Sequence, residues 1–227
     1  MKTIDIHTIH MEAETYFTQK NLARENEIAL SRKVIQLSGS AVRFMHRKEF
    51  EEAQQRILQA HDLLEQIKTT TKEHPDLYFS GTIQDAQKEY TEAAVSLAII
   101  RQQPLPGPAD LQVEWAPYVN GLGEAIGEMR RHLLLEMIHD NMDICEYLLQ
   151  AMDDIYGALA ALIFPDALTN NLRRTVDSAR GIIEKTRGDF VTACMNKKVQ
   201  THIDQMITLI ENSNSRNSSK KDMHENG

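Results

Sequence analysis

The segment YVNGLGEAIGEMRR, residues 118–131, decides the fold class, because its apolar side chains recur at the spacing of an α-helix. Four apolar residues share one stripe of that helix: Tyr118, Leu122, Ala125 and Met129. Pro117 immediately before the segment suits the first turn of a helix. We therefore expect a helix from Pro117 to about His139.

Three glycines, Gly121, Gly123 and Gly127, lie inside this predicted helix. Each glycine costs about 1 kcal/mol relative to alanine in a helix interior. Their presence indicates a backbone surface that another part of the molecule, or a ligand, approaches closely. Plain helix–helix contact through small residues explains the pattern equally well.

The same periodicity runs along the rest of the chain, and no clear two-residue alternation typical of strands appears. Further helices are expected over about residues 11–45, 50–72, 77–101, 142–162 and 166–187, and over a last stretch that reaches about residue 211. Asp166 is the candidate N-cap of the sixth helix, and Gly188 is expected to interrupt the chain after it. The sequence thus predicts an all-α bundle of six or seven helices over residues 1–211, followed by a disordered polar tail over 212–227.

Composition sets limits on function. The chain has 227 residues, of which 41% are hydrophobic, so it can bury a sizeable core. Its 25 Lys and Arg against 33 Asp and Glu give a formal charge of −8, which argues against charge-driven coating of nucleic acid. Two cysteines make no disulfide framework, and the N-terminus has no apolar signal region. We expect a cytoplasmic protein without a membrane span.

Two pairs of carboxylates border the apolar stripes of their helices. Glu89 and Glu92 are three residues apart, and Glu124 and Glu128 are four apart, so each pair lies on one helix face. Similar acidic pairs occur elsewhere in the chain, and a solvated helix face is the ordinary explanation for any one of them. If the two helices pack as neighbours, however, all four carboxylates can converge.

Converging carboxylates repel one another and raise each other's pKa unless a cation lies between them. Mg²⁺ or Mn²⁺ is the natural partner, since both ions prefer oxygen ligands. Such an ion activates a water molecule and neutralises the charge of a phosphodiester. An acidic protein with this site is therefore compatible with a nucleic-acid substrate.

Basic side chains cluster at Arg130, Arg131, Arg173 and Arg174. A salt-bridged helix surface is the simpler interpretation of such clusters. The functional alternative is contact with phosphates along a groove.

Four blocks of the sequence, in order, resemble the family of translin and its partner Trax. The first is LSRKVIQLSGSAVRFMHR at residues 30–47, and the second is EYTEA at 89–93. The third is the 118–131 segment, and the fourth is LRRTVD at 172–177 with Glu184 and Lys185 after it. Together the blocks extend over about residues 20–190.

The resemblance implies a seven-helix subunit that assembles into a hollow, octamer-like shell. It also implies single-stranded RNA as substrate and, for Trax-type subunits, metal-dependent endoribonuclease chemistry with four acidic residues. By motif, these fall on Glu89, Glu92, Glu124 and Glu128. The family has aspartate where this chain has Glu124, and Phe79–Thr82 replaces its basic and histidine residues. The RNA-contacting role is therefore assigned here to the four arginines.

The leading hypothesis is a Trax-like, Mg²⁺- or Mn²⁺-dependent endoribonuclease that cleaves single-stranded RNA and forms a homo-oligomer, with single-stranded DNA as a further candidate ligand. One rival is a non-catalytic, translin-like shell that binds single strands without a divalent ion. A second is an all-α nucleotide pyrophosphohydrolase, which release of pyrophosphate from free nucleotides would identify. A third is an adaptor bundle whose acidic residues are merely solvated.

Overall fold

A computed structural model describes residues 5–224, with side chains described over residues 5–212. The described chain is helical with short connections and contains no strand in that range, as the sequence predicts. Six long helices form it: α1 (Ile6–His46), α2 (Phe50–Thr70), α4 (Gly81–Ile100), α6 (Trp115–Ile138), α7 (Met142–Ala160) and α9 (Leu172–His224). Three single-turn helices lie between them: α3 (Pro75–Tyr78), α5 (Pro108–Leu111) and α8 (Asp166–Thr169).

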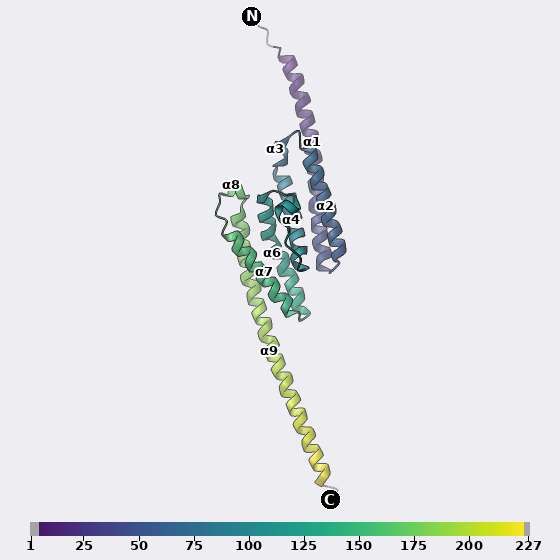
Figure 1. Ribbon diagram of the computed structural model, residues 1–227, viewed down its shortest axis with the longest axis vertical. Helices are drawn as coiled ribbons and strands as arrows, with labels where there is room; N and C mark the ends of the chain where they lie inside the picture. Colours follow the sequence, from purple (N-terminus) through teal and green to yellow (C-terminus); the bar gives the residue numbers. More distant parts are fainter. Residues whose placement is uncertain (1–4, 225–227) are drawn as a thin grey trace.

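The centre of the bundle is the packed pair α4 and α6. Helix α1 packs against α2 and α4 on one side, while α7 and α9 pack against α6 on the other. Figure 1 shows this order, with the first turns of α1 and the last half of α9 extending beyond the bundle at opposite ends. Side chains from all six long helices share one apolar core, in which Met45, Ile83, Ile126, Leu133 and Leu148 are fully buried.

Local capping explains why α4 begins where it does. The sequence predicts one helix from about Leu77 to Arg101, but the chain breaks after α3 and starts again at Gly81. The Ser80 hydroxyl accepts a hydrogen bond from the Ile83 amide at 3.4 Å, which satisfies one of the free amides of the first turn. The break matters for the site, because it fixes which turn of α4 carries Glu89 and Glu92.

The region between α7 and α9 differs most from the expectation. Asp166 is the first residue of α8, and Pro165 takes the N-cap position, so the predicted cap is wrong. Asn170 and Asn171 then both adopt left-handed backbone angles, with φ of 49° and 62°. Asparagine tolerates this conformation better than most residues, and two in succession end α8 and start α9.

Helix α9 passes through Gly188 without the predicted interruption. The penalty of about 1 kcal/mol for a helical glycine is too small to break a helix whose neighbouring turns pack on α6. The helix continues to His224 through most of the segment for which the sequence predicts a disordered tail, and residues 225–227 lie outside the described residues. No change of secondary structure marks position 211, so the division into a domain and a tail stays a prediction.

Within the described residues, no helix combines the length and the apolar character required to cross a membrane.

Candidate metal centre

A glycine contact sets the distance between α4 and α6. A Cβ atom at Gly121 would lie 2.5 Å from the Lys88 carbonyl oxygen and 2.8 Å from the Cβ of Thr91. Only a residue without a side chain fits there, so the backbones of the two helices touch at the turn that carries the carboxylates. Gly123 plays the same part toward α9, where a Cβ would lie 2.5 Å from the Thr175 methyl. The predicted close approach is therefore present at these two glycines, whereas nothing lies within 4 Å of the Cβ position of Gly127.

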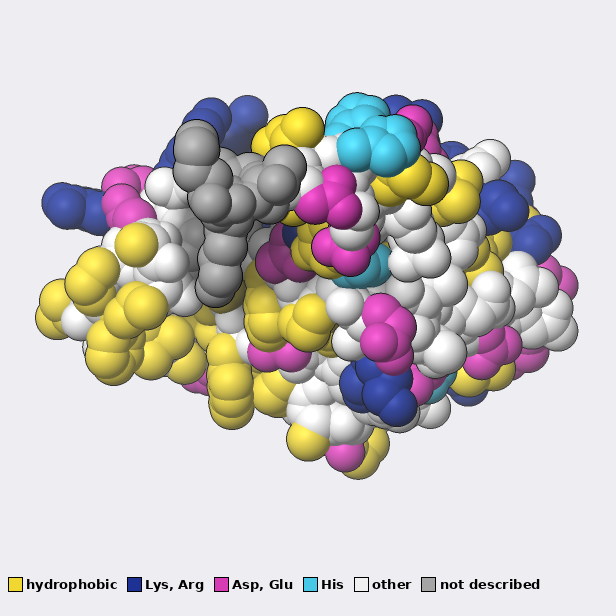
Figure 2. Space-filling view, turned by 90° about the horizontal axis from the view of Figure 1, so that it is seen from above, with side chains coloured by type: hydrophobic (Ala, Val, Ile, Leu, Met, Phe, Trp, Pro, Cys, Tyr) yellow, Lys and Arg dark blue, Asp and Glu magenta, His cyan; other side chains and the backbone are white. Residues whose placement is uncertain are grey.

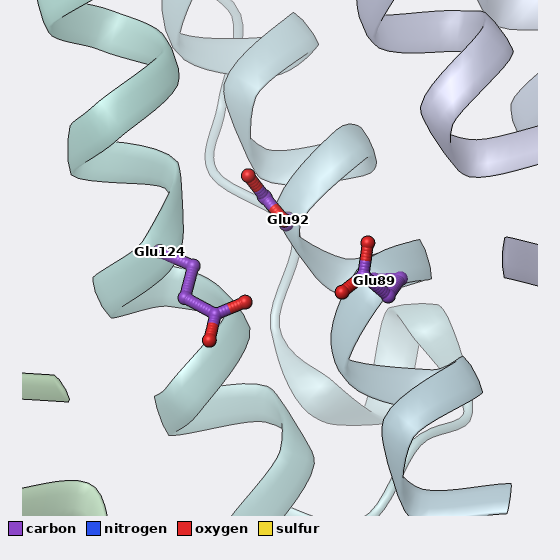
Figure 3. A group of neighbouring side chains, drawn as sticks. All are labelled: Glu89, Glu92 and Glu124. Carbon is purple, nitrogen blue, oxygen red and sulfur yellow. The ribbon is translucent and has the colours of Figure 1, made fainter. Parts of the chain in front are cut away.

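The close packing brings together carboxylates from both helices. One oxygen each of Glu89, Glu92 and Glu124 lies within 4.8 Å of the others, and all three side chains are half-buried. Figure 3 shows Glu124 extending from α6 toward α4, which carries Glu89 and Glu92 on successive turns. Three oxygen donors at this spacing fit a hard divalent cation such as Mg²⁺ or Mn²⁺, which binds a few carboxylates and keeps several waters.

The carboxylates strongly perturb one another. Burial, followed by the charges of Glu89, Glu124 and Glu128, raises the pKa of Glu92 from 4.5 to about 8. Burial also raises the pKa of Glu89, although the nearby Lys88 ammonium opposes the shift. Such shifts cluster at functional sites, because an ordinary solvated helix face does not produce them.

Glu128, the fourth predicted ligand, lies outside this group of three. Its carboxylate pairs with Nε2 of His46, which the last turn of α1 carries into the bundle. The His46 side chain is only 6% exposed, so the pair is largely shielded from water. The Glu128 charge still reaches Glu92, as the raised pKa shows. Spacing predicted that Glu128 shares a face of α6 with Glu124, and the structure shows that its carboxylate pairs with a side chain from the distant helix α1.

Lys88 is a site residue that the sequence pattern did not predict. Its ammonium lies 3.0 Å from Glu124 Oε1 and 3.6 Å from Glu89 Oε1, so it bridges the two helices. Burial lowers the pKa of Lys88, but the hydrogen bond with Glu124 and the charges of Glu124, Glu89 and Asp85 outweigh it, and the pKa is raised overall. Its position directly before Glu89 was the available signal, yet adjacent residues do not share a helix face.

A cleft of about 640 Å³ opens beside the carboxylates. Its walls come from α4, α6, the turn between α8 and α9, and the first turns of α9. Glu92, Glu124 and Lys88 line one side, and Arg174 lines the other. The buried Asn120 amide stiffens the wall, because it donates to the Thr169 carbonyl at 2.7 Å and accepts from the Thr175 hydroxyl at 2.7 Å.

The four predicted RNA-contacting arginines do not form one surface. Arg174 lines the cleft, whereas Arg173 lies against a different pocket beside the segment that connects α7 to α8. Arg131 is exposed on α6. Arg130 is held inside the structure, where it donates to the Thr186 hydroxyl at 2.9 Å and to Asp189 at 2.7 Å, so it ties α6 to α9.

The fold defines the class of protein: an all-α protein of translin-like architecture. Over 82% of the chain, the structure superposes on AfC3PO, a translin/Trax-type complex, with a TM-score of 0.77, 32% sequence identity and 97% coverage of that chain. A complex of AfC3PO with duplex RNA matches equally well, with the same TM-score and identity. Apo-NeC3PO, at 21% identity and a TM-score of 0.69, shares the fold over 85% of this chain.

The chain belongs to the translin family. An uncharacterized protein of Methanocaldococcus jannaschii is 30% identical over 192 residues, which are 84% of this chain and 85% of that protein. The sequence matches no protein-family model.

Proposed function

We propose that this protein is a Trax-like, metal-dependent endoribonuclease that acts on single-stranded RNA in the cytoplasm and works as a homo-oligomer, with an octamer-like shell as the family arrangement. The observation that carries the proposal is the meeting of Glu89, Glu92 and Glu124 beside a cleft that also presents Arg174. RNA as the ligand class is supported by the AfC3PO complex with duplex RNA. Single-stranded RNA and DNA are the proposed ligands for this chain.

The glutamates and Arg174 have different proposed roles. Glu89, Glu92 and Glu124 would hold Mg²⁺ or Mn²⁺, with Glu128 behind Glu92 adding negative charge to the site. When bound, such an ion would supply Lewis-acid chemistry, offsetting the charge of the phosphodiester and making an attacking water more acidic. One of the glutamates accepts the proton of that water. Arg174 contacts a substrate phosphate across the cleft and orients the strand.

A second candidate function is RNA binding without cleavage, and Lys88 favours it. The ammonium already neutralises part of the charge of the carboxylate group, which relieves part of the repulsion without a divalent ion. A subunit of this kind would bind RNA with strong salt dependence and no requirement for metal.

Cleavage of a labelled single-stranded RNA distinguishes the two candidates. The protein is assayed with Mg²⁺, with Mn²⁺, and with EDTA, beside the variants Glu92→Gln and Glu52→Gln. Endoribonuclease activity predicts cutting that needs the divalent ion and falls at least about 100-fold in Glu92→Gln. Glu52 lies exposed on α2 and serves as the matched control, so its variant should cut like the wild type. Equal cutting under all conditions overturns the proposal, and binding without cutting supports the second candidate.

A further inference from the structure

Lys88 occupies the position from which a cation balances the carboxylate group. Its ammonium contacts one oxygen of Glu124 and one of Glu89, two of the three residues proposed as metal ligands. The Lys88 side chain is 22% exposed, so it reaches solvent and is not locked in place by the surrounding protein. No other lysine or arginine within the described side chains forms an ion pair with this group.

A lysine ammonium and a divalent cation compete for the same oxygens. Each stabilises the group by lying close to the negative charge, and the two positive charges repel each other when they share one carboxylate. A cation that binds Glu124 through the oxygen now bonded to Lys88 must therefore push the ammonium away. Removing the lysine charge removes that cost.

The cleft has room for the Lys88 side chain once it is displaced from Glu124. Lys88 lines the cleft together with Arg174, and the cleft of about 640 Å³ leaves room for a four-carbon stem to turn. Asn171 and the first turns of α9 form the wall beside Arg174. An ammonium released from Glu124 would then share the cleft with a guanidinium, and two cations in one cleft favour a phosphate.

We propose that Lys88 is a displaceable counter-ion, which a divalent cation must expel from Glu124 and which, once expelled, contacts a substrate phosphate beside Arg174. The inference rests on the proposed function, since it requires that the carboxylates bind metal. It goes further by coupling the two ligands: metal loading creates part of the phosphate site. Because coupling between two ligands is reciprocal, a bound strand must also favour metal binding.

The first arm of the experiment measures Mn²⁺ binding alone by titration calorimetry. Lys88→Gln should bind Mn²⁺ on the order of tenfold more tightly than the wild type, because the competing charge is gone. Lys88→Arg keeps the charge and should stay near the wild type. Lys197→Gln is the matched control, since Lys197 forms a single ion pair with Asp140 outside the cleft, at 2.7 Å. Its affinity for Mn²⁺ should not change.

The second arm measures binding of a single-stranded 2′-O-methyl RNA with and without Mn²⁺. The ion should raise the affinity of the wild type on the order of tenfold and that of Lys88→Gln by less than about twofold. An unchanged or weaker Mn²⁺ affinity in Lys88→Gln, with Mn²⁺ binding intact in the wild type, overturns the inference alone. An equal effect of Mn²⁺ on RNA affinity in both proteins also overturns it. If the wild type binds no Mn²⁺, the metal-dependent function and this inference both fail.

Discussion

Glu92 holds a proton more tightly in the folded protein than in the unfolded chain, since its pKa rises from 4.5 to about 8. The stability that this proton provides is fully present below the unfolded pKa and is lost as the pH rises through about 8. The native fold is thus destabilised around neutral pH by a residue that the proposed chemistry needs. Stability sacrificed at a site is a common sign that the site is functional.

Replacing Glu92 with glutamine should therefore stabilise the metal-free protein in a pH-dependent way. In EDTA, the melting temperature of Glu92→Gln should exceed that of the wild type by an amount that grows from about pH 5 to about pH 8. Glutamine resembles the protonated glutamate, so the two proteins converge at acid pH. Glu52→Gln is the exposed control and should show a constant difference. A difference for Glu92→Gln that ignores pH would contradict the assigned burial of this carboxylate.

A bound divalent ion should reverse the order of the melting temperatures of the wild type and Glu92→Gln. Because ligands must lose their protons to bind, the affinity of the wild type for Mg²⁺ or Mn²⁺ should increase as the pH rises toward about 8. A saturating ion should also raise the melting temperature of the wild type and leave that of Glu92→Gln nearly unchanged. Thermal unfolding at several pH values, with metal and with EDTA, measures both effects.

Arg130 and Arg174 are expected to differ although both were predicted to contact RNA. Arg130→Gln removes the hydrogen bonds to Thr186 and Asp189, and should cost about 1–3 kcal/mol of stability with little loss of RNA affinity. Arg174→Gln should leave stability unchanged and weaken RNA binding, because Arg174 is exposed in the cleft. Urea unfolding and fluorescence anisotropy with labelled RNA separate the two effects. The reverse result would mean that the arginines are assigned the wrong way round.

At the scale of the helices, the contact at Gly121 is what allows α4 and α6 to share a site. Gly121→Ala places a methyl group against the backbone of α4, which cannot yield as a flexible side chain can. We expect a loss of about 1–3 kcal/mol in the free energy of unfolding, together with weaker metal binding as the helices separate. Gly127→Ala on the same helix meets nothing within 4 Å, and should instead stabilise the protein by up to about 1 kcal/mol. Equal effects of the two substitutions would show that the contact is not tight.

The sequence predicted the long helices and the convergence of three carboxylates because both depend on periodicity along one helix. Stripe position indicated that Glu89, Glu92 and Glu124 converge, since a residue that borders the apolar stripe faces the neighbouring helix, and the structure brings their carboxylates within 4.8 Å of one another. The pairing of Glu128 with His46 could not be predicted, because the histidine comes 82 residues earlier and reaches the site only through the packing of α1. The start of α9 was also missed, because it depends on two asparagines whose side chains carry no helical periodicity.

At the scale of the whole molecule, the described residues expose several apolar regions, and two of them lie on or beside α9. The middle of α9 presents a stripe of exposed residues: Val191, Met195, Val199, Ile203 and Met206. The connection from α7 through α8 exposes Leu162, Ile163, Phe164 and Leu168. Figure 2 shows hydrophobic side chains gathered at the left of the end view, on the side where Figure 1 places α8. Apolar surface of this extent is typical of proteins that associate.

Lysine at two positions of the α9 stripe should reduce the size of the assembly. Met195→Lys with Ile203→Lys places two charges on the exposed face, and we expect a smaller molar mass by light scattering. Thr208→Lys, on the opposite side of the same helix, should leave the mass unchanged. Mn²⁺ binding by the double variant should persist, since the carboxylate group lies on α4 and α6. An unchanged mass would show that the α9 stripe is not the interface.

The unbroken helix α9 joins two places that are far apart. It begins at the wall of the cleft with Arg174 and Thr175 and continues for 53 residues, about 80 Å at 1.5 Å per residue. Arg130 ties α9 to α6 through Thr186 and Asp189, so the part of the rod beyond these residues extends from the bundle as an arm (Figure 1). A partner that binds the tip of this arm can therefore dock without covering the cleft where α9 begins.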